Sequence, residues 1–365
     1  MSTELATTSG MTAIEAAGHV ANKYAAASAF AKYTAGKSDN TLDAQRTDLA
    51  TFADYLCDAT GGRDCPTAAQ LQTDPAAWRG MTHGLVAGFA EWMLQHGYSM
   101  ASINRKLSTV RVYAKLAGDA KVIDTDETTL IRGVRGYGGK EGKRVDERRK
   151  EAGQATRTGH KKAQHVRLDT EHVKALKMQP DTPQGRRDAV IMCLLLDHGL
   201  RVGELAGLPV SGQVVTGDGV KDVGVFLSRD ARGTVTGGKF IFYRPKVDKV
   251  QTHTLTNGAL AAVARWIDTD APQEGLLLRG SRKGGHLTGA GMSERAITQR
   301  VTDLGEAIGV YGLSAHDCRH SWATRAATAG TDSFALRDAG GWNSLAMPSR
   351  YVESATVANE RVKLD

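Results

Sequence analysis

Residues 316–324 read HDCRHSWAT, and the chemistry that the sequence predicts centres on this short stretch. It contains a His-x-x-Arg pair, His316 and Arg319, followed directly by a second histidine, His320. An arginine guanidinium is planar, donates two parallel hydrogen bonds and stays charged at every relevant pH, which suits it to the oxygens of a phosphate. Arginines on helices usually lie at the surface, but the flanking histidines favour a buried, functional Arg319.

A second arginine occurs far upstream, after an apolar run. Arg201 lies in LLLDHGLRVGEL (194–205), and Glu204 follows it by three residues on the same helical face. Glu204 is therefore predicted to hold the Arg201 guanidinium in place. An ordinary surface pair between the two residues is the alternative interpretation.

A third segment, AGGWNSLAMPSRYV (339–352), combines a glycine-rich break, the hydrogen-bond donor Trp342 and the phenol of Tyr351. Direct displacement at a phosphodiester needs a nucleophile, and Tyr351 is the candidate. A tyrosine has an unperturbed pKa of about 10, so forming its phenolate at pH 7 costs roughly 4 kcal/mol. Arginines and a histidine close to Tyr351 are expected to lower that cost.

The departing 5′ oxygen needs an acid, and Lys246 in YRPKVDKVQTHTL is the candidate because it lies just before a predicted hairpin turn. Lys249 is a competing candidate, and Lys239 is a weaker one. We expect no metal and no ATP in this chemistry, because a phosphotyrosyl bond conserves the energy of the phosphodiester. The sequence also has no H-E-x-x-H motif, no C-x-x-C pair and no carboxylate cluster of the two-metal nuclease type.

Composition sets outer limits on the class of protein. A chain of 365 residues suits two domains, and a formal charge of +7 favours a polyanionic partner without proving one. Four cysteines without a C-x-x-C pair predict a reduced, intracellular protein rather than a disulfide scaffold. The sequence has no signal-peptide pattern and no apolar stretch approaching about 18 residues, so we expect a cytoplasmic protein that associates with the nucleoid when bound to DNA.

The pattern of helix and strand signals predicts a mainly α-helical chain with a small antiparallel β-sheet in the catalytic domain. The sheet is expected from the β-branched and aromatic segments of residues 214–255. We predict four parts: an N-terminal tail or accessory helix (1–37), a helical domain (38–132), a basic interdomain linker (133–167) and a catalytic domain with a C-terminal tail (168–365).

Two predicted helices carry cations that could face DNA. In the helix over residues 100–117 an apolar stripe leaves cationic side chains on the other faces, and a solvated surface is the alternative interpretation. From these helix faces we predict six DNA-binding residues: Arg105, Lys106, Arg111, Arg295, Gln299 and Arg300.

Taken together, the three segments resemble the tyrosine recombinase (phage integrase) family. GLRVGEL resembles the family's first-arginine box, HDCRHSWAT is very close to its H-x-x-R box, and GGWN followed by Tyr351 resembles its nucleophile segment. The resemblance covers residues from about 168 to the end, and more weakly residues 38–120, which look like the family's helical core-binding domain. Many members have a histidine at the position of Trp342. The Cre-like simple recombinases have a tryptophan there, as this chain does.

The resemblance implies a role for each matching residue. Tyr351 would attack the phosphate and leave a 3′-phosphotyrosyl bond, with Lys246 as general acid. His316 is also a candidate acceptor of the tyrosine proton. Transition-state stabilisation would fall to four residues, namely Arg201, His316, Arg319 and Trp342, with Glu204 and His320 in support.

The resemblance further implies the partners and the assembly. Family members form a two-domain clamp around double-stranded DNA, and four protomers exchange strands at paired sites through a Holliday junction. We therefore expect a site-specific recombinase that is a homotetramer on DNA and a monomer or weak associate when free. The tail after Tyr351 is long enough for a short helix that could dock on a neighbouring protomer, as the tails of family members do. A type IB topoisomerase-like relaxation enzyme and a non-catalytic sequence-specific DNA-binding protein on the same fold are the alternatives.

Overall fold

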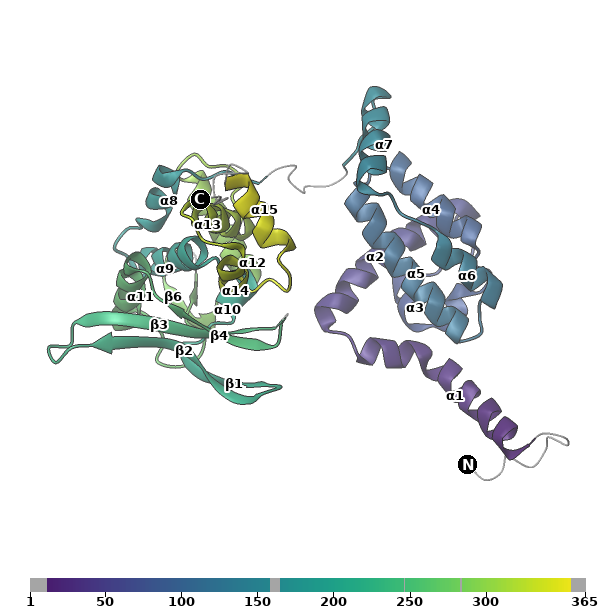
Figure 1. The fold of residues 1–365 in the computed structure, drawn as a ribbon, viewed down its shortest axis with the longest axis horizontal. Coiled ribbons are helices and arrows are strands. Elements are labelled where there is room, and N and C mark those ends of the chain that lie inside the picture. Colours follow the sequence, from purple (N-terminus) through teal and green to yellow (C-terminus); the bar gives the residue numbers. More distant parts are fainter. Residues whose placement is uncertain (1–11, 158–164, 246, 283, 356–365) are drawn as a thin grey trace, which may run out of the picture. The chain divides into compact units, whose positions relative to one another are not determined.

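The computed structural model describes residues 12–157, 165–245, 247–282 and 284–355. The chain divides into two compact units, one ending at Lys161 and the next beginning at Lys162 (Figure 1). Within the described ranges, no helix has both the length and the apolar character needed to cross a membrane. The elements of the first unit are α1 (Ala13–Ala35), α2 (Asp39–Thr60), α3 (Ala68–Thr73), the 3-10 helix η2 (Pro75–Trp78), α4 (His83–Gln95), α5 (Met100–Asp119), α6 (Thr125–Gly133) and α7 (Gly139–Glu151).

An aromatic core holds the first unit together. The Phe52 ring of α2 lies 5.9 Å from the Trp78 ring and 5.0 Å from the Phe89 ring, measured between centroids. All three side chains are fully buried. Helix α1 contributes one buried side chain, Phe30, whose ring lies 5.9 Å from that of Tyr113 in α5.

A buried polar cluster joins α2 to α5 and corrects one prediction. Lys106, predicted to bind DNA, is only 5% exposed, because its ammonium donates to Thr51 Oγ1 at 2.7 Å and to Asp48 Oδ1 at 3.4 Å. Asp48, itself buried, also accepts hydrogen bonds from Thr109 and Arg105. A buried carboxylate needs such partners, so Lys106 serves the fold of this unit and cannot reach a DNA phosphate.

The stretch 133–167, predicted to be a linker, contains helix α7. Its residue Arg149 is buried, although the sequence around it is densely charged. The Arg149 guanidinium donates to the carbonyls of Leu94, Tyr98 and Ala155, which fastens α7 to the end of α4. An arginine can supply several directed donors from one buried position, so a polar helix can pack without apolar side chains.

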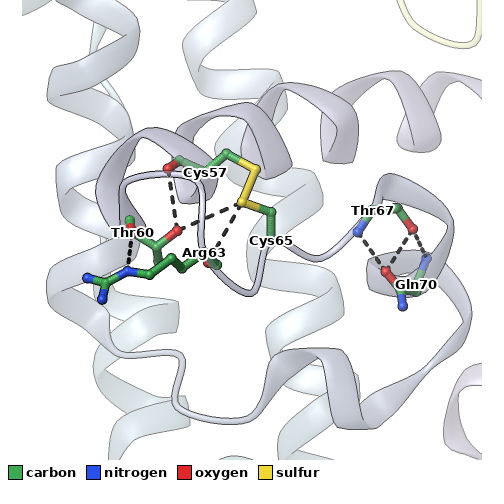
Figure 2. The surroundings of a disulfide bond; sticks show 6 residues. All are labelled: Cys57, Thr60, Arg63, Cys65, Thr67 and Gln70. Carbon is green, nitrogen blue, oxygen red and sulfur yellow. Dashed lines mark hydrogen bonds between the residues drawn. A yellow bond between two sulfur atoms is a disulfide. The ribbon is translucent and has the colours of Figure 1, made fainter.

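The prediction that the cysteines are all reduced is wrong for one pair. Cys57, near the end of α2, and Cys65 form a disulfide across a short loop (Figure 2). The loop also holds Arg63, whose Nε donates to the carbonyl of Thr60. Cys193 and Cys318 are buried and take no part in this disulfide, as expected of cysteines that pack as small apolar residues. The eight-residue spacing of Cys57 and Cys65 gave no recognised motif, and only the turn between them brings them together.

The second unit combines helices with two small antiparallel sheets, which confirms the predicted fold class. Four strands pair in the order β1-β2-β3-β4, two short strands form a separate ribbon, and Figure 1 shows the helices gathered on one side of the larger sheet. The elements are α8 (Thr170–Lys177), α9 (Pro183–His198), α10 (Val202–Ala206), β1 (Ser211–Thr216), β2 (Gly219–Arg229), β3 (Val235–Arg244), β4 (Lys249–Thr254), α11 (Asn257–Thr269), β5 (Arg279–Ser281), β6 (Leu287–Gly291), α12 (Glu294–Glu306), α13 (Ala315–Thr328), α14 (Ser333–Gly340) and α15 (Ala346–Ala355).

Strand β3 connects the sheet to the helical core. Successive side chains of a strand point to opposite faces, so Phe240, Phe242 and Arg244 share one face. All three are almost completely buried. The pairing of Arg244 with Lys249 closes the predicted β3–β4 hairpin.

Two histidines lie in this apolar layer. The ring of His198, at the end of α9, packs 5.0 Å from Phe240 and 5.7 Å from His253 of β4. The Nε2 atoms of both histidines are buried without a hydrogen-bond partner in the described part of the chain. Burial lowers the pKa of His198 to about 4 and that of His253 to about 3, and for His253 the neighbouring His198 and Arg244 act in the same direction.

These two histidines predict that acid destabilises the second unit. Below the ordinary histidine pKa of about 6.5, both histidines become protonated in the unfolded chain but stay neutral in the folded chain. Their contribution to the free energy of unfolding is therefore complete above about pH 6.5 and is lost as the pH falls towards 4. At about 1.4 kcal/mol per pKa unit, His198 alone accounts for a loss on the order of 3 kcal/mol. Urea unfolding at pH 7.5 and pH 4.5 measures this loss, and in the His198→Phe/His253→Phe double variant the loss should be much smaller. Equal losses in both proteins would contradict the assignment.

Candidate active site

Most of the predicted catalytic residues converge from α10, α13 and α15 and from the turn that follows α14. Arg201 is the N-cap residue of α10, just after the left-handed Gly199 that ends α9. Its Nη1 donates to Glu204 Oε1 at 2.7 Å, and its backbone N–H donates to the other oxygen of the same carboxylate at 2.8 Å. Glu204 is buried, so the pair is not the ordinary surface contact that the sequence left open.

Arg319 lies at the centre of the site on α13. Ser314 and Asp317 form the capping box that starts this helix, which fixes the direction in which Arg319 projects. The Arg319 guanidinium is buried, donates to the carbonyls of Gly199 and Gly340, and stacks on the ring of Trp342 at 4.2 Å. Burial, followed by repulsion from Arg201, lowers the pKa of Arg319 to about 9.

A pair of glycines at the end of α14 makes room for the arginines. Gly341 has φ +62°, and a Cβ atom there would lie 2.5 Å from Nη1 of Arg244. At Gly340 a Cβ would lie 1.9 Å from the ring of Trp342. Position 341 therefore needs glycine for its left-handed backbone and for the contact with Arg244, and position 340 needs glycine for the contact with Trp342. These two requirements explain the glycine-rich break before Trp342.

Arg244 is a site residue that the sequence analysis missed. It is 1% exposed, and its Nη1 donates both to Glu204 Oε1 at 2.9 Å and to the carbonyl of Gly340 at 2.8 Å. Its Nη2 donates to the carbonyl of Ala339 at 2.8 Å. Burial lowers the pKa of Arg244 to about 10, although Glu204 opposes this effect. The alternation of buried residues along β3 was the signal that could have revealed it.

Tyr351 is half-buried on α15, and its hydroxyl forms a short hydrogen bond with Nδ1 of His320. On the other side of that ring, His320 Nε2 lies 3.0 Å from Nε2 of His316, one helical turn away on α13. The partner of the phenol is therefore His320, whereas sequence analysis favours His316 as acceptor of the proton. His316 is the second member of the same chain of hydrogen bonds.

The electrostatics of Tyr351 differ from expectation. Burial raises the pKa of the phenol, and the opposing effect of Arg319 is smaller. Burial and the neighbouring His165 and His316 lower the pKa of His320 to about 4, and burial also lowers the pKa of His316. Both imidazoles are therefore neutral at pH 7, and each has a lone pair that can accept a hydrogen bond or a proton. The lowered pKa of His320 also makes it a weaker base, so the free protein holds the proton on Tyr351.

The remaining predicted residues are not part of this cluster as described. Lys246 lies outside the described residues, and the Lys239 ammonium lies 5.8 Å from the Phe226 ring centroid. On α12, Arg295 is exposed, Gln299 donates to Asp303, and Arg300 pairs with the buried Asp188 at 2.7 Å. In the first unit, Arg105 pairs with Asp48 while half-exposed, and Arg111 donates to the carbonyl of Val134.

Known proteins resemble this chain in sequence and in fold. Residues 166–357 match the family model described as "Phage integrase family". The tyrosine recombinase XerC of Roseiflexus castenholzii is 22% identical over 319 residues, which covers 86% of this chain and 83% of the relative. XerC of Roseiflexus sp. (strain RS-1) is 22% identical over 321 residues, with 86% and 82% covered.

Two solved structures share the fold. The Tn1549 transposon integrase in complex with transposon right end DNA is 16% identical, covers 90% of this chain and 94% of its own, and has a TM-score of 0.54. A lambda integrase dimer bound to a core site is 14% identical, covers 92% and 96%, and also has a TM-score of 0.54.

The contacts of Arg244 predict that it is needed for stability. Replacing it by methionine leaves the buried Glu204 without one of its two cations, and breaking a buried pair in this way costs about 3 to 5 kcal/mol. Urea unfolding should show this loss in Arg244→Met, a smaller loss in Arg244→Lys, and partial recovery when Glu204→Gln is added to Arg244→Met. Arg337→Met is the control, because Arg337 lies in the same region but pairs with Asp338 at the surface. Equal stability of the Arg244→Met and Arg337→Met proteins would contradict the assignment.

Proposed function

Because the chain belongs to the phage integrase family, we propose that it is a site-specific DNA recombinase that cleaves and rejoins duplex DNA through a 3′-phosphotyrosyl bond to Tyr351. The observation that carries the proposal is the arrangement of the nucleophile. The Tyr351 hydroxyl is hydrogen-bonded to a neutral base, beside two arginines fixed by backbone carbonyls and a buried carboxylate.

The arginines would stabilise the charge that develops on the phosphate. Arg201 and Arg319 each keep N–H groups beyond those held by their anchors, and they would donate these to the two non-bridging oxygens. Trp342 would act through Arg319, since its ring covers the face of that guanidinium. Rigid placement before DNA arrives is what makes such donors effective, because little reorganisation is then needed during the reaction.

The histidines would receive the proton of the nucleophile by a relay. With the proton of His320 on Nε2, its Nδ1 accepts the hydrogen bond from Tyr351 and its Nε2–H donates to His316. As the phenolate oxygen bonds to phosphorus, the phenolic proton passes to His320 Nδ1 and the Nε2 proton passes to His316. His320 ends neutral, and His316 ends protonated next to the phosphate, where its positive charge would stabilise the negative charge of the transition state.

The bond between phosphorus and the 5′ oxygen breaks in the same step, and we propose Lys246 as the donor of the proton to that oxygen. Lys246 follows β3 by two residues and precedes β4 by three. Lys249, the first residue of β4, is the competing candidate.

Exchange between two duplexes requires four strand cleavages, and each protomer offers one Tyr351. We therefore propose that four protomers assemble on paired sites and resolve a Holliday junction.

Arg105 and Arg295 are the cations that we expect to contact DNA phosphates, since both are exposed enough to reach a ligand. Arg111, Gln299 and Arg300 are held by partners within the protein and would support these contacts. The Tn1549 transposon integrase and the lambda integrase dimer, which share the fold, were both solved in complex with DNA, and this supports the choice of partner.

The nucleophile assignment predicts that Tyr351→Phe abolishes covalent attachment and leaves DNA affinity within about twofold, since only one hydroxyl is removed. Denaturing gels of the protein with nicked duplexes taken from DNA flanking its gene measure the adduct, and gel shifts measure affinity. Tyr311→Phe is the control, because Tyr311 is a 77% exposed tyrosine of the same unit. An adduct with the Tyr351→Phe protein would disprove the assignment, and specific binding without an adduct in the wild type would favour a non-catalytic DNA-binding protein.

The relay predicts that His316 and His320 act as one unit. General-base groups typically contribute 10² to 10⁴ in rate, so His320→Ala should slow single-turnover cleavage by at least about a hundredfold. The double variant His316→Ala/His320→Ala should be no slower than His320→Ala alone, because the relay is already broken. Multiplied effects in the double variant would instead indicate that His316 acts on the phosphate independently of His320.

A further inference from the structure

A third histidine stands beside the two of the relay. The ring of His165, which lies just before α8, packs 3.6 Å from that of His320 and 5.6 Å from that of His316. One ring nitrogen from each of the three histidines lies within 4.8 Å of the other two. His165 and His316 are exposed and His320 is half-exposed, so an ion in solvent can reach all three. The proposed strand-cleavage step assigns no role to His165.

The two histidines of α13 have the spacing of a metal-binding pair. His316 and His320 are four residues apart on one helix face, and their Nε2 atoms lie 3.0 Å from each other. Zinc binds histidine nitrogen at about 2.0 to 2.1 Å in tetrahedral geometry, which places two ligand nitrogens about 3.3 Å apart. A shift of a few tenths of an ångström would therefore bring both nitrogens into position.

The third ring is oriented by a carboxylate. His165 Nδ1 faces Asp317 Oδ1 at 3.5 Å, which leaves its Nε2 for a ligand. Asp317 is itself buried and fixed, because it accepts hydrogen bonds from the backbone and hydroxyl of Ser314 and from the backbone of Val166. A carboxylate behind a histidine sets the tautomer and orientation of ligating rings in metal proteins. Asp317 also supplies a negative charge that partly offsets the nearby arginines.

We propose that His165, His316 and His320 form a site for one divalent transition-metal ion of the zinc class. Three imidazoles would hold the ion, and water would complete the coordination in a fourth, open position. Imidazole nitrogens favour zinc, copper, nickel and cobalt over magnesium and calcium, so the ligand set selects the class of ion.

The bound ion would switch off strand cleavage, a consequence that rests on the proposed function. It would take the Nε2 lone pairs of His316 and His320, which are the two atoms joined in the relay. A neutral imidazole coordinated through Nε2 carries its proton on Nδ1, so His320 would donate to the Tyr351 oxygen and could not accept its proton. Removing the metal would restore the relay.

Cobalt absorption tests the site without reference to activity. The full-length protein, freed of metal by a chelator, is titrated with Co²⁺, and we expect visible bands of low-coordinate Co²⁺ that saturate at one ion per chain. His165→Asn should weaken binding at least about tenfold, whereas the control His286→Asn, which changes an exposed histidine of the same unit, should leave it unchanged. Absence of saturable binding, or equal affinity in wild type and His165→Asn, would overturn the site.

Adduct formation tests the consequence. One equivalent of Zn²⁺ should suppress the adduct of the wild type at least about tenfold, with recovery on adding a chelator, and should suppress that of His165→Asn much less. The wild type could bind one Co²⁺ per chain and yet form the adduct equally well with and without Zn²⁺. That result would disprove the inhibition but not the metal site. Absence of adduct from metal-free wild type would count against the proposed function, while the absorption titration would still decide the metal site.

Discussion

The carbonyl groups that end helix α14 are the structural constraint on which the candidate active site depends. The last carbonyls of an α-helix have no partner within the helix, and they must be satisfied when they are buried. The carbonyls of residues 339–341 accept hydrogen bonds from three arginines, Arg201, Arg244 and Arg319. One short helix therefore anchors cations that come from α10, β3 and α13. The close approach of Arg244 explains the glycine at position 341, and the close approach of the Trp342 ring explains the glycine at position 340.

These anchors leave the site with more positive than negative charge. Three buried or half-buried guanidinium groups surround one carboxylate, Glu204. The lowered pKa values of Arg244 and Arg319, about 10 and about 9, express the cost of holding those charges out of water. A phosphate of DNA would supply the missing negative charge and would relieve the repulsion among the three guanidinium groups. Glu204 keeps the repulsion small enough for the site to fold before DNA arrives.

Much of this site was readable from short motifs, because the groups that we propose to act on the phosphate lie, apart from Lys246, within three compact segments. The H-x-x-R pair, Arg201 with Glu204, and the Trp342 to Tyr351 segment all meet as the sequence indicates. The small sheet was also predictable, since its strands carry β-branched and aromatic residues. In each case the information is local, and a single segment contains both the residue and the structural signal that positions it.

Other features were not predictable because they depend on contacts between distant segments. Arg244 and Lys106 read as surface cations, and only the burial of their partners, Glu204 and Asp48, shows that they belong to the interior. His165 follows a charged stretch with no motif, and it reaches the histidines of α13 only through the fold. A charged residue at an apolar position of an alternating strand is the sequence signal that deserves more weight, and Arg244 after Phe240 and Phe242 is an example.

Different helices position the arginines and the proposed nucleophile of the site. The arginines are tied to the end of α14, whereas Tyr351 lies on the next helix, α15, and its described polar side-chain contact is the one with His320. Tyr351 also packs, together with Val352, against a small apolar cluster formed by Trp322, Ala323, Ala327 and Leu336 of α13 and α14. The guanidinium groups are instead held by directed hydrogen bonds to the carbonyls at the end of α14. Apolar packing and one hydrogen bond therefore place the proposed nucleophile, whereas hydrogen bonds to backbone carbonyls place the charges that would bind the phosphate.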